Sequence, residues 1–228
     1  MRTERIGNAT LYLGDCVDLM RGYADQAFDV AIVDPPYAVG ASDGSFGRGG
    51  ARSQIKEYRR DLSNYANHDI PPNADYFTQL FRVSRHQIIW GANYYPQYLR
   101  HSGWVVWDKE KKDGLLSQAE LAFQSFDKVV RIFKHEWEGF RKGHGSFEGT
   151  LDKIIHPNQK PVRLYEWLLV TYCHGLKTVL DTHSGSASLA VATNKLGYDL
   201  IAIELHEPYY TASCERIENA QRQGRLIA

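Results

Sequence analysis

The sequence is poor in cysteine and has no long apolar run. Its three cysteines, Cys16, Cys173 and Cys214, are odd in number and lie far apart. We therefore expect neither a disulfide framework nor a metal site, and a reducing cytoplasm is the expected location. No apolar run reaches the roughly 18 residues that a membrane span requires. The first residues also lack the apolar stretch of a secretory signal.

An excess of charge of one sign is missing as well. The 27 lysine and arginine side chains balance the 27 aspartate and glutamate side chains, so any basic surface must be local. Hydrophobic residues make up 43% of the chain and charged residues 24%, which excludes the disordered and fibrous classes. Internal repeats are also absent. The length of 228 residues predicts a single domain, 1–228, with a sizeable core.

What is present is an alternation of short apolar runs and amphipathic stretches. Helices are predicted from Pro161, through 191–196 and from Pro208. Together with the intervening strands, they indicate a doubly wound α/β fold with a parallel sheet. Apolar runs that end in polar residues predict buried strands at 11–13, 30–33, 87–90, 104–107, 120–123, 129–133, 178–180 and 200–203.

Two polar, glycine-rich stretches, 38–67 and 136–155, do not fit this alternation. The first contains five glycines. Loops of this length inside a compact domain are usually functional or disordered, and solvated surface loops are the alternative interpretation. The basic side chains of the two stretches are Arg48, Arg52, Lys56, Arg59 and Arg60 in the first, and Arg141 and Lys142 in the second.

The tetrapeptide Asp34-Pro35-Pro36-Tyr37 directly follows the predicted strand at 30–33. Because each proline fixes φ, one interpretation is a rigid turn that ends the strand. The other interpretation is catalytic. An exocyclic base amine is a poor nucleophile until two fixed acceptors bind its hydrogens. The Asp34 carboxylate and the Pro35 carbonyl would provide that pair, and Tyr37 would stack a base that has left the duplex.

This tetrapeptide resembles the catalytic motif of the amino DNA methyltransferases, the family that makes N6-methyladenine or N4-methylcytosine. The resemblance implies that S-adenosylmethionine is the cofactor. It also implies that Asp34, Pro35, Pro36 and Tyr37 form the catalytic centre, and that Asp34 borders the cofactor as well.

A second segment, 181–188, resembles the glycine-rich cofactor loop of the family, Asp-Pro-Phe-x-Gly-x-Gly-Thr, and departs from it at positions 182, 183 and 187. A tight turn after a strand lets the backbone approach a cofactor. Glu204 stands 23 positions after Asp181, where a carboxylate for the ribose is expected; a strand-end surface acid is the alternative. The cofactor-binding residues implied here are Asp181, His183, Ser184, Gly185, Ser186, Ser188 and Glu204.

Two further segments complete the resemblance. Residues 156–161, His-Pro-Asn-Gln-Lys-Pro, resemble the motif His-Pro-Thr-Gln-Lys-Pro of the family, in which Lys160 would meet the methionine carboxylate. A plain helix start between two prolines is the alternative. Asp15 and Cys16 follow the first predicted strand, and the resemblance places them beside the adenine of the cofactor. Asp15 as a helix N-cap is the other interpretation, and both can hold together.

The order of the motifs, catalytic turn first and cofactor loop last, resembles the permuted β class of the family. The implied fold is a Rossmann-like S-adenosylmethionine-dependent methyltransferase fold with a seven-stranded, mostly parallel sheet and one antiparallel strand. The strands at 11–13 and 30–33 should lie beside those at 178–181 and 200–204. Dimerisation is common in the β class, so a homodimer is implied. Trp90, Trp104 and Trp107 are expected in the core, and 118–126 is assigned packing alone.

We predict a site-specific adenine-N6 methyltransferase of double-stranded DNA that acts on a flipped-out base. The flexible basic loop 38–67 is expected to contact phosphates, and 136–155 to act as a short target-recognition insert. Cytosine-N4 methylation is the first alternative, followed by RNA amine methylation and a non-catalytic DNA-binding regulator. Cytosine-C5 methylation needs a thiolate, and none of the three cysteines lies in a catalytic setting. A restriction endonuclease partner cannot be read from the sequence.

Overall fold

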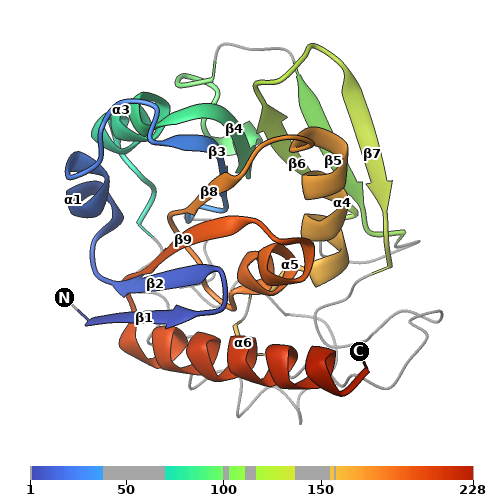
Figure 1. Cartoon of the computed structure of the whole chain (residues 1–228). Coiled ribbons are helices and arrows are strands. Elements are labelled where there is room, and N and C mark those ends of the chain that lie inside the picture. The colour runs from blue at the N-terminus through green and yellow to red at the C-terminus, as the bar shows by residue number, and fades with distance from the viewer. Residues whose placement is uncertain are drawn as a thin grey trace, which may run out of the picture.

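The computed structural model describes residues 2–37, 70–99, 103–110, 117–136, 155–156 and 158–227. Every strand and helix predicted from the sequence is present, with bounds that differ by a few residues (Figure 1). In chain order the elements are β1 (Arg2–Ile6), β2 (Ala9–Leu13), α1 (Cys16–Arg21), β3 (Phe28–Val33), α3 (Ala74–Val83), β4 (Ser84–Trp90), the 3-10 helix η2 (Ala92–Tyr94), β5 (Trp104–Asp108), β6 (Ala119–Gln124), β7 (Val130–Lys134), α4 (Val162–Tyr172), β8 (Thr178–Asp181), α5 (Ser188–Leu196), β9 (Asp199–Glu204) and α6 (Glu207–Ile227).

The described strands form one sheet in the order β1-β2-β9-β8-β3-β4-β6-β5-β7. The predicted count of seven strands with one antiparallel strand is therefore wrong: the sheet has nine strands, and both β1 and β6 run against their neighbours. The seven strands from β2 to β5 in this order contain only β6 as an antiparallel member. The sequence does not predict β1, because four of its five residues are exposed and therefore form no apolar pattern.

Strands far apart in the sequence are neighbours in the sheet, as the sequence predicted. β2 pairs in parallel with β9, and β3 pairs in parallel with β8. β8 and β9 are also parallel partners, as are β3 and β4. The carboxyl ends of these five strands therefore lie along one edge of the sheet, where ligand sites of open α/β sheets form.

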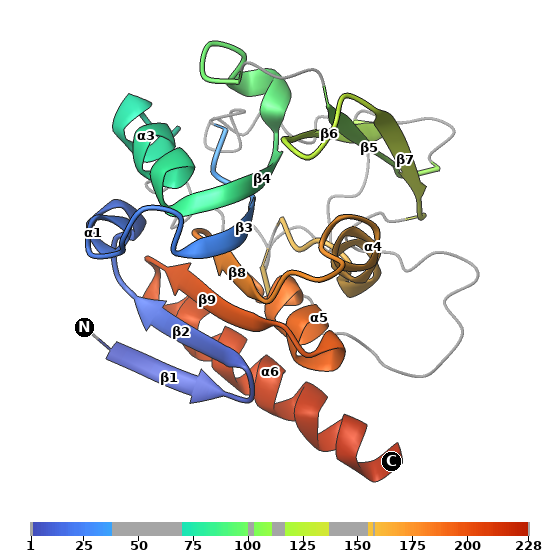
Figure 2. The ribbon, with the colours of Figure 1, turned by 45° about the horizontal axis from the view of Figure 1, so that its top comes forward.

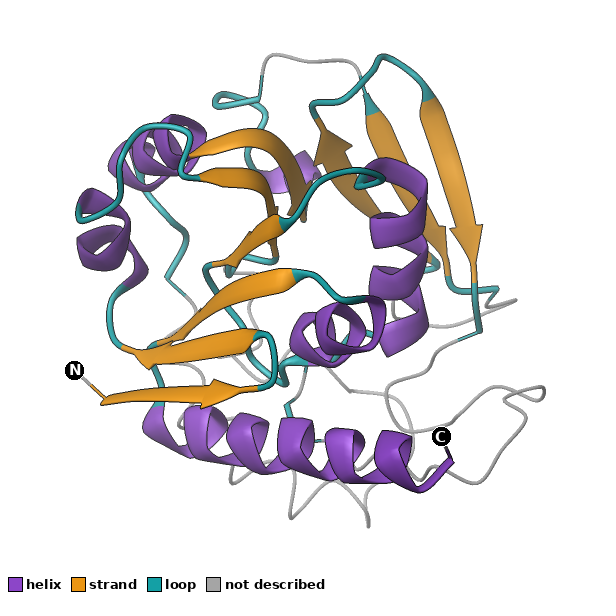
Figure 3. Ribbon diagram, in the orientation of Figure 1, coloured by secondary structure: helices purple, strands orange, loops and turns teal. Residues whose placement is uncertain are grey.

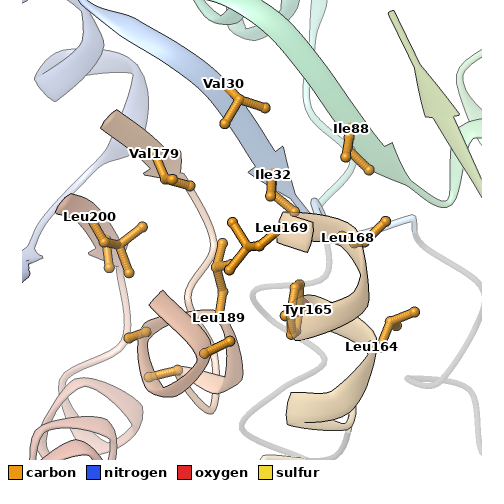
Figure 4. Close-up of a cluster of buried hydrophobic side chains, with 14 of the residues drawn as sticks. Val30, Ile32, Ile88, Leu164, Tyr165, Leu168, Leu169, Val179, Leu189 and Leu200 are labelled. Atoms are coloured by element: carbon orange, nitrogen blue, oxygen red, sulfur yellow. The ribbon is translucent and has the colours of Figure 1, made fainter. Parts of the chain in front are cut away.

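Helices cover both faces of the sheet (Figures 2 and 3). Side chains alternate along β3, so that Val30 and Ile32 pack in the cluster of α4, α5 and α6, while Ala31 and Val33 pack in the cluster of α1 and α3. This two-sided burial explains why β3 is apolar throughout. Figure 4 shows the first cluster, in which Leu168 and Leu169 of α4 approach Ile32 of β3.

Two tryptophans expected in the core are fully buried, Trp90 on β4 and Trp107 on β5, whereas Trp104 is half-buried. The sequence predicts the short helix α1 only through the N-cap interpretation of Asp15, and it does not predict α3. Its buried residues are Tyr76, Phe77, Leu80 and Val83, a helical period that was available in the sequence. Among the described helices, none combines the length and the apolar character needed to cross a membrane.

Candidate active site

The tetrapeptide Asp34-Pro35-Pro36-Tyr37 lies at the carboxyl end of β3, and its carboxylate is held on both oxygens. Asp34 Oδ1 accepts a hydrogen bond of 2.6 Å from the Tyr37 hydroxyl. Asp34 Oδ2 pairs with the Lys160 ammonium. The Asp34 side chain keeps 16% of its exposure, and each carboxylate oxygen has a second lone pair for another donor. The turn therefore presents an oriented carboxylate that can still accept hydrogen bonds.

The loop after β4 supports this turn, and no residue of the loop was predicted to do so. The buried Tyr95 donates a hydrogen bond to the Pro36 carbonyl and lies 3.3 Å from the Pro35 carbonyl. The Tyr94 ring stacks on the Tyr37 ring, with centroids 5.0 Å apart and planes 8° apart. Gly91 has a φ of +66°, and a Cβ at this position would collide with the Tyr37 ring. The segment that follows β4 thus supports the tetrapeptide turn.

Lys160 lies at the start of α4 and is buried, with 4% of its side chain exposed. Its ammonium pairs with Asp34, lies 3.2 Å from Glu120 Oε2 and lies 3.4 Å from the Tyr37 hydroxyl. Burial alone would lower the pKa of Lys160, but the charges of Asp34 and Glu120 outweigh it and raise the pKa above its ordinary value. Contact with a methionine carboxylate stays a prediction, and it requires Lys160 to exchange one of these partners.

Glu120 on β6 is a charged member of the site that the sequence interpretation missed, because 118–126 was assigned packing alone. Its Oε1 lies 2.5 Å from the Lys109 ammonium, and its Oε2 faces Lys160. Although burial acts to raise it, the charges of Lys160 and Lys109 lower the pKa of Glu120 to about 2. A glutamate inside an otherwise apolar predicted strand was the signal that could have identified this position.

The predicted cofactor loop follows β8, and its central glycine contacts the predicted ribose carboxylate. Gly185 has a φ of +50°, and its backbone N–H donates a 2.8 Å hydrogen bond to Glu204 Oε2. Glu204 Oε1 accepts a 2.9 Å bond from the N–H of His206. Burial raises the pKa of Glu204 to about 7, against the lowering effect of these backbone donors. The structure thus brings Gly185 and Glu204 together at one strand edge.

Asp181 is buried and His183 is half-buried at the same edge. Asp181 accepts a 3.1 Å hydrogen bond from the N–H of His183, and burial raises the pKa of Asp181 to about 8. Burial lowers the pKa of His183 to about 4, so its ring is neutral at neutral pH. The His183 Nδ1 lies 2.9 Å from the Thr182 hydroxyl, which in turn bonds the Tyr76 hydroxyl at 2.7 Å. Helix α3 therefore fixes the start of the loop.

The three predicted serines of the loop differ in their contacts. Ser188 donates a 2.7 Å hydrogen bond to the Lys160 carbonyl, and its hydroxyl lies 3.2 Å from that of Ser186. Both serines are buried. The bond of Ser188 connects the start of α5 to the residue that lies just before α4. Ser184 is also buried, and its hydroxyl has no hydrogen-bond partner among the described residues. Of the three serines, Ser184 is thus the one whose hydroxyl could bond a ligand without giving up a contact with the described residues.

Asp15 and Cys16 lie at the carboxyl end of β2, beside the end of β9, because the Gly14 N–H donates a 2.9 Å bond to the Glu204 carbonyl. Asp15 caps α1 by accepting bonds of 2.8 and 3.0 Å from the N–H groups of Val17 and Asp18. The N-cap interpretation is therefore confirmed. Burial raises the pKa of the Cys16 thiol to about 12, so it carries no thiolate at neutral pH.

The predicted DNA contacts lie outside the described residues. They are Arg48, Arg52, Lys56, Arg59 and Arg60 of 38–67, and Arg141 and Lys142 of 136–155. Within the part of the chain that is described, no group of three histidine, cysteine, aspartate or glutamate side chains could hold a metal ion.

One relative by sequence and two solved structures are similar to this chain over most of its length. YubD of Escherichia coli (strain K12), which carries a provisional name as a methylase, is 26% identical over 227 residues, covering 92% of this chain and 90% of YubD. The structure of the M1.HpyAVI–SAM complex matches with a TM-score of 0.52 and 15% identity, covering 92% and 98% of the two chains. The PvuII DNA methyltransferase, described as cytosine-N4-specific, matches with a TM-score of 0.54 and 13% identity, covering 94% and 90%.

The two structural matches show that this chain has the Rossmann-like fold of S-adenosylmethionine-dependent methyltransferases. The family model described as DNA methylase (N6_N4_Mtase) matches residues 72–215, more than half of the chain. The tetrapeptide 34–37 precedes that segment, and Lys160, Gly185 and Glu204 lie inside it. The chain belongs to the N6/N4 family of DNA methylases.

Proposed function

We propose that the protein is a site-specific adenine-N6 methyltransferase of double-stranded DNA that uses S-adenosylmethionine. The observation that carries this proposal is the oriented carboxylate of Asp34, held by Tyr37 and Lys160 beside the carbonyl of Pro35. Membership of the DNA methylase family supports the reaction class. The choice of adenine rests on the tetrapeptide itself, because Asp at its first position is typical of the adenine enzymes that the sequence resembles.

The strand edge that holds Gly185 and Glu204 fits S-adenosylmethionine. The left-handed Gly185 leaves room for close backbone approach, the Ser184 hydroxyl is buried without a partner among the described residues, and Glu204 offers a carboxylate to ribose hydroxyls. M1.HpyAVI, which shares this fold, was solved with SAM. When bound, the cofactor supplies a methyl group on a sulfonium. The residues proposed to hold it are Asp15, Cys16, Lys160, Asp181, His183, Ser184, Gly185, Ser186, Ser188 and Glu204, and Asp34 is proposed to border it without being needed to retain it.

The catalytic residues act on the target amine through position and charge. The Asp34 carboxylate accepts one N–H of the amine, and the Pro35 carbonyl accepts the other. These two hydrogen bonds favour a pyramidal nitrogen whose lone pair is available for attack. Tyr37 presents the aromatic face on which the flipped base stacks. The methyl group would pass to the nitrogen as its bond to the sulfonium sulfur breaks, which would leave a neutral thioether; the nitrogen would then carry the positive charge, and the proton that it loses can pass to Asp34.

Tyr94 occupies one face of the Tyr37 ring in this structure. A base that stacks on Tyr37 must therefore use the opposite face or displace Tyr94, which is 44% exposed. The stacking role of Tyr37 is compatible with either route.

The DNA contacts and the assembly form a further part of the proposal. The basic residues of 38–67 contact phosphates, and 136–155, with Arg141 and Lys142, forms a short recognition insert within a single catalytic domain. Because this insert is short, a homodimer would supply additional contacts for specificity. The raised pKa values of Cys16, Cys173 and Cys214 support the exclusion of a cysteine nucleophile and hence of cytosine-C5 chemistry.

Cytosine-N4 methylation is the second candidate, because the PvuII enzyme of similar fold is described as cytosine-N4-specific. One experiment separates the candidates. Purified protein is incubated with isotope-labelled S-adenosylmethionine and either unmethylated duplex DNA or RNA, and the nucleosides are identified by mass spectrometry. We expect labelled N6-methyladenine from DNA. Labelled N4-methylcytosine would contradict the adenine assignment, and label in RNA alone would contradict the DNA assignment.

A further inference from the structure

We propose that Glu120 is a positioning residue for methyl transfer, which holds Lys160 so that the ammonium contacts only one oxygen of Asp34. The inference rests on the proposed function, because it concerns how Asp34 is kept ready for the target amine. Glu120 comes from β6, a strand to which the sequence interpretation gave no role in the site. It reaches the catalytic centre through Lys160 and contacts no predicted substrate position itself.

Four charged side chains form an alternating row that ends at the catalytic carboxylate. Lys109 lies 2.5 Å from Glu120 Oε1, Glu120 Oε2 lies 3.2 Å from Lys160, and Lys160 pairs with Asp34 Oδ2. Asp34 Oδ1 then accepts from Tyr37 at 2.6 Å. Glu120 thus has one lysine at each oxygen, although its Oε2 contact with Lys160 is an ion pair without a hydrogen bond, and the oxygens of Asp34 are shared between Lys160 and Tyr37. The two positive and two negative charges sum to zero, which is the condition under which buried charges are tolerated.

The backbone fixes this row. Lys109 immediately follows β5, and its N–H donates a 2.9 Å bond to the Gln118 carbonyl, just before β6. In the antiparallel pair of β5 and β6, Trp107 stands opposite Glu120. The Ser188 hydroxyl at the start of α5 donates a 2.7 Å hydrogen bond to the Lys160 carbonyl and so holds the Lys160 backbone. Both lysines therefore approach Glu120 from anchored segments.

The second carboxylate changes what Lys160 can do to Asp34. An ammonium has three N–H donors, so a buried ammonium with Asp34 as its single carboxylate partner could direct donors to both carboxylate oxygens. That arrangement would occupy the lone pairs that the target amine needs. Glu120 offers a competing negative charge on the other side of the ammonium, and Lys109 prevents Glu120 from becoming an unpaired buried charge. Lys160 then orients Asp34 through Oδ2 and leaves acceptor capacity on both oxygens.

The test compares Glu120→Gln with Glu166→Gln. Glu166 is a matched control because it also pairs with a lysine, Lys195, at 2.8 Å, and its side chain is 23% exposed, against 25% for Glu120. This control pair joins α4 to α5 outside the site. For each protein we would measure kcat and KM for methyl transfer to duplex DNA, the cofactor Kd by calorimetry, and the thermal unfolding midpoint.

We expect Glu120→Gln to lower kcat by at least about tenfold, the cost of roughly one misplaced hydrogen bond in the transition state. Its KM for DNA should change by less than about threefold, because Glu120 is not among the residues proposed to contact DNA, and the cofactor Kd reports any change in the proposed contact of Lys160 with the methionine carboxylate. Lys109→Met should lower kcat in the same direction, and the double variant should lose less than the sum of the two effects, since both act through Lys160. Glu166→Gln should leave kcat unchanged.

A Glu120→Gln protein with the kcat of Glu166→Gln would overturn the inference. So would a loss of kcat that merely follows the loss of folded protein in the unfolding measurement. If the wild type binds S-adenosylmethionine but methylates no nucleic acid, the proposed function itself fails and the role of Glu120 with it. An active wild type with an unaffected Glu120→Gln variant overturns only the inference about Glu120.

Discussion

The hydroxyl of Tyr95 donates a hydrogen bond to the carbonyl of Pro36, and it lies 3.3 Å from the carbonyl of Pro35. The Pro35 carbonyl is one of the two proposed acceptors for the target amine, so Tyr95 fixes the direction of this group from the loop after β4. We predict that Tyr95→Phe lowers kcat by about tenfold. The free energy of unfolding should fall by only about 1 kcal/mol, the usual contribution of such a bond.

Steady-state methylation kinetics and urea denaturation measure these two effects. Tyr198→Phe is the matched control, because the Tyr198 hydroxyl also lies near two backbone carbonyls, at 3.4 Å from Leu169 and 3.3 Å from Cys173. Tyr198 precedes β9, at the opposite end of the sheet. Equal losses of kcat in the two variants would mean that Tyr95 contributes stability alone.

The raised pKa of Glu204, about 7 against an ordinary value of 4.5, predicts a pH dependence of both stability and cofactor binding. Because the fold favours the protonated carboxyl, the stability it contributes is present below pH 4.5 and is lost as the pH rises through 7. The ionised carboxylate is the better acceptor for ribose hydroxyls. The cofactor Kd should therefore fall by about tenfold between about pH 6 and 8.

Calorimetry and chemical denaturation across this range check both trends, with Glu204→Gln expected to flatten them. Asp181, whose pKa is raised to about 8, adds to the loss of stability and remains in that variant. Asp29→Asn is the control, because Asp29 also accepts from two backbone N–H groups, of Lys177 and Thr178. Those bonds lower its pKa, so its stability contribution is lost on acidification. A wild-type Kd that is constant with pH would refute the ribose role of Glu204.

The basic stretch 38–67 predicts a salt-dependent contribution to DNA binding. Replacing Arg59 and Arg60 with alanine should reduce the slope of log K against log salt concentration by about two, one unit for each phosphate contact that is lost. Fluorescence anisotropy with a duplex at several salt concentrations measures the slope. The control is the double variant of Arg85 and Arg222, whose side chains are 58% and 69% exposed. If both double variants changed the slope equally, the DNA contact would not be specific to 38–67.

The fold was largely predictable because the strands at the centre of its sheet are buried on both faces. β3 and β8 read as continuous apolar runs, and the parallel order followed from the alternation with helices. β1 could not be read in this way, since it pairs through its backbone while Arg2, Thr3, Glu4 and Arg5 stay exposed. The helix α3 had a readable period but stood next to a stretch without apolar pattern, where a boundary is hard to place.

The site was predictable where it is contiguous in sequence and not where it depends on sheet register. The segments 34–37 and 185–188 are each continuous in the sequence, and their residue types indicate the chemistry that they can perform. Glu120 approaches Asp34 through Lys160, and Tyr95 lies near the Pro35 carbonyl, only because β6, the loop after β4 and the segment before α4 meet at one place in the fold. The glutamate in an apolar strand can be seen in the sequence, but the residues that it meets from distant segments cannot. The methionine-carboxylate contact of Lys160 stays a prediction for the same reason, because its partners depend on the folded arrangement.

The central claim is that Asp34 acts on the amine of a DNA base and is not needed to retain the cofactor. The most direct measurement compares wild type and Asp34→Asn in one assay of methyl transfer to unmethylated duplex DNA, with the cofactor Kd measured on the same preparations. We predict N6-methyladenine from the wild type, a loss of rate of at least about 100-fold in the variant, and a cofactor Kd that stays within about threefold. Methyl transfer by Asp34→Asn near the wild-type rate would contradict this account.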